Sequence, residues 1–473
     1  MKKFKRLLIK NGTLIDGETI RQGDILIEGE KIQDIAPHID LPKENTTSID
    51  AKGLYVLPGA IDAHTHMDLP LTSFTSKGIH SSDSFTSGSR AALFGGTTTI
   101  IDFANQTRGQ SLSKALSAWK QRAAKKTYCD YSFHLSVTDT SNSTLGELAM
   151  MAKDEGITSF KIFTTYESMR LSWEQIEIIL KRVRDIGGLV TIHAEEDTIL
   201  REKKEELIRE GKTSAAYHGE ARPIEAEVRA VERIVSLAQE VGCPLYIVHL
   251  SCAQSLEIIS HSEIKTPLLL ETCPQYLMLD DSLYDPKKLI QSVRAIFSPA
   301  ARPWIEKEGL WQGILQNKFH VLASDHCPFT TTQKKKGLKD FAQVPSGIPG
   351  VENRLEILHS EGVIKRGLSL ENWVKLCCAN PAKIFGLYPQ KGSLEVGSDA
   401  DLVLFDPNKE HKISAKTHHM KCDYSSYEGL KVQGKCQVVI LRGQVAINKN
   451  KLKLPKGFGK LLKRKLFSSS LIP

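Results

Sequence analysis

The stretch LYVLPGAIDAHTH, residues 54–66, decides the fold. Its first nine residues are mostly apolar, which predicts a buried strand over residues 54–62. Two histidines follow with a single residue between them. Because alternate residues of an extended chain point to the same side, His64 and His66 can face one site.

Seven more strand-like segments follow, and helical patterns such as residues 111–126 and 224–241 lie between most of them. This alternation is typical of parallel strands joined by helical crossovers. Eight such repeats over residues 54–386 predict an α/β fold, a closed (β/α)8 TIM-like barrel. An open, doubly wound sheet is the alternative. The seven strands are expected at 97–103, 131–137, 158–164, 189–194, 245–251, 267–273 and 320–326.

The two ends of the chain have a different pattern. Residues 1–53 and 387–448 contain short β-branched segments punctuated by glycine and Asp-Pro, such as LLIKNGTLID (7–16) and ADLVLFDP (400–407). We predict that both ends combine into one small β-sandwich domain. Residues 449–473 then form a basic C-terminal tail.

The charge of the chain is concentrated in this tail. The net charge is +8, from 63 basic and 55 acidic residues, and eight basic but no acidic residues lie from Lys449 to the end. No nucleic-acid-binding motif accompanies them, which favours a solvated or subunit-docking tail. We expect no nucleic acid and no membrane as partners.

The cysteines and the N-terminus indicate the compartment. Nine cysteines without a C-x-x-C pair favour a reducing environment. The apolar run before Lys10 is too short for a signal peptide, and no apolar stretch approaches membrane-spanning length. We therefore expect a cytoplasmic protein.

Residues that can bind metal lie where the predicted strands end, which is where barrel active sites form. Each of them alone could be structural, but their convergence at one end of a barrel predicts a single metal site. A lysine is normally a cation that binds no metal, so Lys161 could equally form a buried ion pair. The residues are His64, His66, Lys161, His193, His249 and Asp325.

The chain resembles the cyclic amidohydrolases of the urease-related superfamily, specifically dihydropyrimidinases and hydantoinases. The resemblance covers nearly the whole chain and implies a barrel with a small β-sandwich built from both termini. It lies in motifs that include PGAIDAHTHMDLP (58–70), FKIFTTY (160–166), IHAE (192–195), ETCPQYL (271–277), SDHCPF (324–329) and PSGIPGVENR (345–354).

The resemblance also implies two divalent metal ions per chain, with zinc as the expected ion and manganese or cobalt as possible substitutes. Lys161 would be carbamylated, which converts its amine into a carboxylate that bridges both ions. The first ion would be held by His64, His66 and Asp325, and the second by His193 and His249.

The implied reaction is the hydrolytic opening of a cyclic amide, a 5,6-dihydropyrimidine or a 5-substituted hydantoin, to an N-carbamoyl amino acid. Two cations would generate a hydroxide from water near neutral pH. Asp325 would carry a proton to the leaving nitrogen, and Tyr166 would donate a hydrogen bond to the carbonyl oxygen. Backbone groups of Ser298 and Ser346 would bind the amide edge of this small-molecule substrate.

Two departures from the family leave the preferred ring open. Many relatives have Pro-Pro-Leu where residues 299–301 are Pro-Ala-Ala, and many have asparagine where Ser346 stands. We expect the loops around Leu71, Phe74 and Tyr166 to select the ring substituent.

Two other functions are considered. Allantoinase, or another hydrolase of cyclic ureides, is the alternative within the same chemistry. A non-catalytic scaffold like the collapsin-response mediator proteins is the alternative of another class, and it is disfavoured because all six ligand positions are filled. Family members are commonly homotetramers, and we expect the same here.

Overall fold

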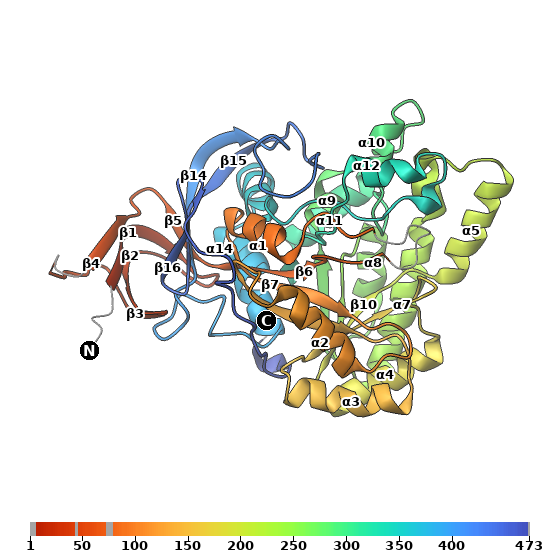
Figure 1. Ribbon diagram of the computed structural model, residues 1–473, viewed down its shortest axis with the longest axis horizontal. Helices are drawn as coiled ribbons and strands as arrows, with labels where there is room; N and C mark the ends of the chain where they lie inside the picture. The colour runs from red at the N-terminus through yellow and green to blue at the C-terminus, as the bar shows by residue number, and fades with distance from the viewer. Residues whose placement is uncertain (1–5, 43–45, 72–78, 472–473) are drawn as a thin grey trace.

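The computed structural model describes residues 6–42, 46–71 and 79–471, which contain a barrel of parallel strands and a separate sheet (Figure 1). Eight parallel strands pair in chain order, and Thr65 at the end of the first bridges to His326 just after the last. The predicted (β/α)8 barrel is confirmed. Its strands are β6 (Ala60–Thr65), β7 (Thr97–Asn105), β8 (Asp130–Ser136), β9 (Ser159–Phe163), β10 (Leu189–His193), β11 (Leu245–Ile247), β12 (Leu268–Thr272) and β13 (Val321–Leu322).

Helices follow the barrel strands and cover their outer face (Figure 1). Several begin at a serine whose hydroxyl accepts a hydrogen bond from the N–H three residues on, as at Ser111, Ser141 and Ser172. Such a cap satisfies a backbone donor that the helix leaves unpaired. The helices are α1 (Phe85–Phe94), α2 (Leu112–Ala123), α3 (Asn142–Lys153), α4 (Trp173–Asp185), α5 (Asp197–Arg209), α6 (His218–Ala221), α7 (Ile224–Val241), α8 (Ala253–His261), α9 (Pro274–Met278), α10 (Leu289–Arg294), α11 (Trp304–Leu315), α12 (Thr331–Lys334), α13 (Arg354–Ile357), α14 (Leu370–Val374) and α15 (Asn380–Ile384).

The second sheet is built from both ends of the chain, as predicted. Its order is β17-β16-β15-β14-β5-β1-β2-β3, and β4 lies beside β1. β5 pairs in parallel with β1 and antiparallel with β14, so the N-terminal and C-terminal strands meet there. The strands are β1 (Arg6–Ile15), β2 (Ile20–Glu28), β3 (Lys31–Ala36), β4 (Thr46–Asp50), β5 (Tyr55–Pro58), β14 (Leu402–Lys412), β15 (Lys431–Leu441), β16 (Gln444–Asn448) and β17 (Lys451–Leu452).

The single strand predicted over residues 54–62 is wrong. It divides at Gly59 into β5, which belongs to the terminal sheet, and β6, which opens the barrel. A side chain at Gly59 would begin 2.1 Å from Thr98 Oγ1, so only glycine allows the close approach that moves the chain between sheets. The domain boundary after residue 53 stays a prediction, and β5 lies on its barrel side.

The basic tail packs against the barrel of its own chain. Tyr131, near the start of β8, donates a backbone hydrogen bond to Lys460 and accepts one from Leu462. Leu462 is 8% exposed and packs in a cluster with Ile61, Ile101 and other residues of the barrel strands. The tail therefore covers the amino-terminal end of the barrel, opposite the end where its strands finish.

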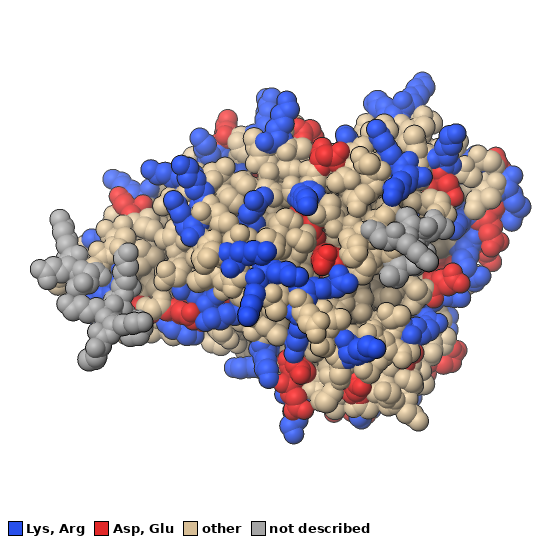
Figure 2. Space-filling model, viewed as in Figure 1, with Lys and Arg blue, Asp and Glu red and all other residues tan. Residues whose placement is uncertain are grey.

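Basic and acidic side chains are interspersed over the face of the molecule shown in Figure 2. All nine cysteines lie within the described residues, and each is a free thiol. No helix in the described ranges combines the length and apolar character needed to cross a bilayer.

Leu462→Ala is expected to lower the free energy of unfolding by about 2 to 4 kcal/mol, because it leaves a cavity in a packed cluster. The matched control is Leu466→Ala, whose side chain is 48% exposed and which should change stability by less than about 0.5 kcal/mol. Urea unfolding followed by circular dichroism measures both variants. Equal midpoints would show that the tail adds nothing to the core.

Candidate active site

A cavity of about 660 Å³ lies at the carboxyl ends of the barrel strands. Cavities of this size and position are typical of active sites in this fold. The structure brings together in its wall every site residue that the sequence predicted. They are His64, His66, Lys161, Tyr166, His193, His249, Ser298, Asp325 and Ser346.

Three of these residues form one cluster. The Nε2 atoms of His64 and His66 each lie 3.2 Å from Oδ1 of Asp325. All three ligand atoms lie within 4.8 Å of one another. On its other side, Nδ1 of His64 lies 2.7 Å from Glu271 Oε1, which holds the ring with Nε2 toward the cavity. Two imidazoles and a carboxylate in this arrangement can hold a divalent ion.

Two further histidines form a second cluster beside the first. Nδ1 of His193 lies 2.9 Å from Nε2 of His249, so both rings present a nitrogen to the same point. The opposite nitrogen of His193 lies 2.7 Å from Glu195 Oε2. The ring centres of His64 and His249 are 5.4 Å apart, so the two clusters adjoin.

Lys161 is buried between them on β9. Its Nζ has no hydrogen-bond partner among the described residues and lies 5.0 Å from the ring centre of Phe163. Burial lowers the pKa of Lys161 from 10.5 to about 7, although Glu271 and Asp325 oppose the shift. An amine without a hydrogen-bond partner can react as a nucleophile when it is neutral.

The buried imidazoles are held in their metal-binding form. Burial lowers the pKa of His193 to about 4, and it also lowers the pKa of His66. For His249, burial and the adjacent His193 lower the pKa well below its usual value. Neutral imidazole is the form that binds metal ions. Burial alone would raise the pKa of Asp325, but the nearby His64 and the hydrogen bond with His66 keep it below its ordinary value.

The backbone is strained at three of these positions. Tyr166, His249 and Asp325 have φ angles of 72°, 39° and 48°, in a region of backbone conformation that residues other than glycine seldom adopt. Such conformations persist only where the surrounding structure enforces them, and they cluster at functional sites. Here they occur at three residues that line the cavity.

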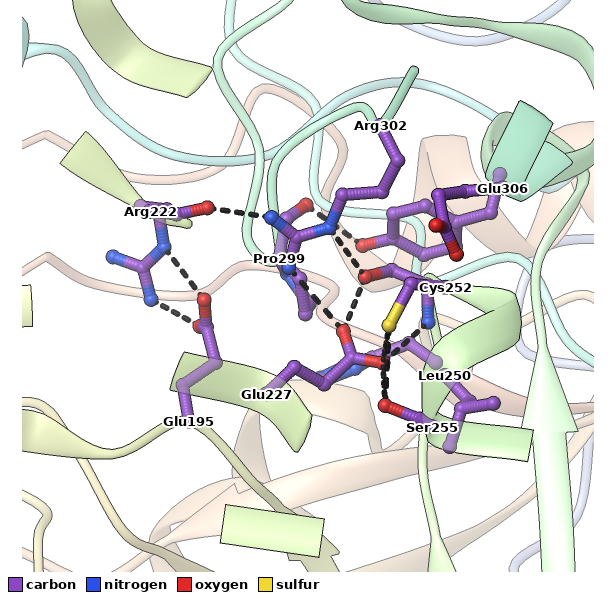
Figure 3. A network of polar contacts seen from close by, with 12 residues as sticks. Glu195, Arg222, Glu227, Leu250, Cys252, Ser255, Pro299, Arg302 and Glu306 are labelled. Carbon is purple, nitrogen blue, oxygen red and sulfur yellow. Dashed lines mark hydrogen bonds and ion pairs between the residues drawn. The ribbon is translucent and has the colours of Figure 1, made fainter. Parts of the chain in front are cut away.

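Figure 3 shows a network of charged side chains that includes Glu195, Arg222, Glu227 and Arg302, and this network contacts the second cluster through Glu195. Glu195 accepts hydrogen bonds from both His193 and Arg222. The guanidinium of Arg222 lies 5.5 Å from the ring centre of Tyr166. The Arg222 carbonyl in turn accepts from Arg302, so the pair is tied to a further buried arginine.

The same network reaches the loop after β11. Arg302 donates to Ser251 Oγ at 2.9 Å and pairs with Glu227, whose carboxylate also accepts from the Ser251 N–H at 3.1 Å. Ser251 is two residues after His249. The same group of charges therefore contacts His193 directly through Glu195 and, through Glu227 and Arg302, the loop that follows His249.

Sequence analysis missed the residues that orient the histidines. Glu195 and Glu271 lie inside the motifs IHAE and ETCPQYL, but nothing in a single sequence distinguishes a buried carboxylate from an exposed one. The one available signal is that Glu195 stands two residues after His193 in extended chain, on the same side. Arg222 lies outside any motif we identified.

The barrel and its histidine-rich cavity define a metal-dependent hydrolase. The sequence matches the family model described as "Amidohydrolase family" over residues 55–446. The chain belongs to this family, whose members bind divalent metal.

Several relatives match over nearly the full length of the chain. The chain is 39% identical to a D-hydantoinase of Streptomyces coelicolor over 96% of its own length and 97% of the relative's. It is 40% identical to a D-hydantoinase of Geobacillus stearothermophilus, covering 97% of this chain and 96% of that one. The crystal structure of dihydropyrimidinase from Brevibacillus agri superposes with a TM-score of 0.94 and 39% identity, over 98% and 99% of the two chains.

Glu195→Gln is expected to lower the amount of bound divalent metal and to reduce kcat by about 10- to 100-fold, because His193 loses the carboxylate that orients it. Elemental analysis after dialysis and steady-state kinetics measure the two effects. The matched control is Glu196→Gln, whose side chain makes no capping hydrogen bond at the start of α5. Full metal content in both variants would contradict the orienting role.

Proposed function

We propose that the protein opens the ring of a 5,6-dihydropyrimidine or a 5-substituted hydantoin by hydrolysis, giving an N-carbamoyl amino acid. One observation carries the proposal: the two metal-binding clusters and the unpaired Lys161 line the same cavity as Ser298 and Ser346. The similarity to hydantoinases and dihydropyrimidinases over the whole chain supports the same reaction.

Two zinc ions per chain fit the donor atoms of this site. His64, His66 and Asp325 would hold the first ion, and His193 and His249 the second. Lys161 would bridge the two as a carbamate, and its orphaned amine beside both clusters supports this role. The ions would supply acidity, since divalent metal lowers the pKa of a bound water toward neutrality.

The protein's own groups would then guide the proton and the developing charge. Asp325 would take the proton of the attacking water and pass it to the ring nitrogen as the C–N bond breaks. Burial raises the pKa of Tyr166 to about 12, so its phenol keeps its proton and can donate to the carbonyl oxygen.

Two backbone groups would bind the amide edge of the ring. Within the described part of the chain, no donor approaches the Ser298 carbonyl and no acceptor approaches the Ser346 N–H. One acceptor and one donor on the cavity wall match the N–H and C=O of a cyclic amide. Because these are backbone groups, the departures from the family at residues 299–301 and 346 leave them in place.

The ring substituent would meet mostly apolar side chains. Leu71 and Tyr166 line the cavity together with Trp119 and Met169. These are contacts suited to an apolar group on the ring. Phe74, also expected to select the substituent, lies outside the described residues.

We further propose a cytoplasmic homotetramer. Nine free thiols support a reducing compartment. The tail from Lys449 was expected to dock on a neighbouring subunit. This docking stays a prediction, and only the exposed residues of the tail could contact a neighbouring subunit.

The decisive assay compares dihydrouracil, a 5-substituted hydantoin, allantoin and dihydroorotate, with enzyme supplied with zinc and bicarbonate. Turnover of dihydrouracil or the hydantoin is expected, and Lys161→Ala should reduce it on the order of a thousandfold or more, since the bridging ligand is lost. Turnover of allantoin or dihydroorotate alone would keep the mechanism and overturn the ring assignment. No turnover of any ring would contradict the proposal.

Carbamate formation on Lys161 should depend on pH. Only the neutral amine attacks carbon dioxide, and with a pKa of about 7 its neutral fraction rises as the pH increases through 7. Metal-free enzyme equilibrated with ¹³C-labelled carbon dioxide at constant dissolved concentration should show a carbamate signal by NMR that grows from pH 6 to pH 8. The signal should be absent in Lys161→Ala. A signal independent of pH would contradict the assignment.

A further inference from the structure

Lys334 is a buried lysine beside the site that the proposed mechanism does not use. It belongs to a run of three lysines, Lys334, Lys335 and Lys336, after the last barrel strand. The composition of this run predicts a solvated face, and for Lys334 that prediction is wrong. Lys335 and Lys336 are exposed, whereas Lys334, the last residue of α12, has 0% exposure. Its Nζ donates hydrogen bonds to the carbonyls of Ile296 at 2.7 Å and Pro345 at 2.9 Å.

These two carbonyls belong to the two segments that carry the proposed amide-binding groups. Ile296 is two residues before Ser298, and Pro345 directly precedes Ser346. The segments are also joined by the hydrogen bond from the Gly347 N–H to the Ile296 carbonyl, 3.0 Å. The side chain of Lys334, on α12, therefore contacts both segments at once.

The neighbouring carbonyls of the first segment are also occupied. His218 Nε2 lies 2.8 Å from the Phe297 carbonyl, and the Tyr276 hydroxyl donates to the Pro299 carbonyl at 2.9 Å. Buried side chains thus bind the carbonyls on either side of Ser298. The Ser298 carbonyl itself has no donor in the described residues. The segment is held so that this one acceptor remains for a ligand.

We propose that Lys334 is a positioning residue for substrate binding: it sets the spacing of the two segments so that the Ser298 carbonyl and the Ser346 N–H bind the same cyclic amide together. The inference rests on the proposed function, since it assigns these backbone groups to the substrate.

The surroundings of Lys334 favour this role over that of an ion-pair partner. Among the described residues, the groups that act on its charge are the thiols of Cys422 and Cys327, and no carboxylate is among them. Burial lowers the pKa of Lys334 from 10.5 to about 7. A neutral amine has two N–H donors, which match the two carbonyls. Since burying an amine is costly, an apolar side chain would fill this space more cheaply, and the two hydrogen bonds are what the lysine adds.

The test compares Lys334→Met with Lys335→Met and Lys336→Met in the zinc-loaded, full-length enzyme. The ring that the wild type hydrolyses best serves as the substrate. KM of Lys334→Met should rise about tenfold, with kcat within about threefold of the wild-type value. The substrate's hydrogen bonds to the Ser298 carbonyl and the Ser346 N–H would be misaligned in both the ground state and the transition state, which weakens binding without slowing the chemical step. Both controls should keep the wild-type KM. Metal content should be equal in all four proteins.

A purely structural role would lower kcat in proportion to the folded fraction and leave KM unchanged, and that result would overturn the inference. If Lys334→Met does not fold, Lys334→Gln replaces it. Its side chain is one atom shorter and reaches at most one of the two carbonyls, so KM should again rise, and an unchanged KM would overturn the inference. Failure of the proposed function is distinguishable, because then the wild type itself would open none of the rings.

Discussion

The carboxylate of Glu271 is the contact on which the site depends. It lies on β12 and accepts hydrogen bonds from His64 Nδ1, from the backbone N–H of His249 and from the Tyr246 hydroxyl. One buried side chain therefore holds both His64, on β6, and His249, just after β11. A buried carboxylate with three donors is well satisfied, whereas removing any donor would leave charge in an apolar interior. Glu271 therefore links the two histidine clusters of the candidate site.

The barrel and the terminal sheet contribute differently to the candidate site. The barrel aligns the ends of eight strands, so residues far apart in the chain meet without long side chains. The terminal sheet stands apart from the cavity and joins β5 to strands from the far end of the chain. The chain passes from the sheet to the barrel at Gly59, beside Thr98, and returns to the sheet between α15 and β14. The predicted site residues lie at one end of the barrel, on the strands and in the loops after them, and the sheet brings the two ends of the chain together.

The sequence predicted most of the fold because strand and helix patterns are local. Strands β7 to β13 lie within or close to the predicted segments, and all nine predicted site residues line one cavity. Gly59 was missed because its role arises from a close approach to Thr98, which lies 39 residues away in the chain. Glu271 and Arg222 were missed for the same reason, whereas Glu195 was missed because a single sequence does not distinguish a buried carboxylate from an exposed one. Lys334 was misassigned because a run of lysines has the composition of a solvated surface, and its two carbonyl partners come from distant segments.

The position of Leu462 has a consequence for biosynthesis. Leu462 follows all eight barrel strands in the chain, so the strands are synthesised before the segment that covers their amino-terminal end. Until that segment emerges from the ribosome, the barrel has an uncovered apolar end, and nascent chains with exposed apolar surface are prone to aggregation.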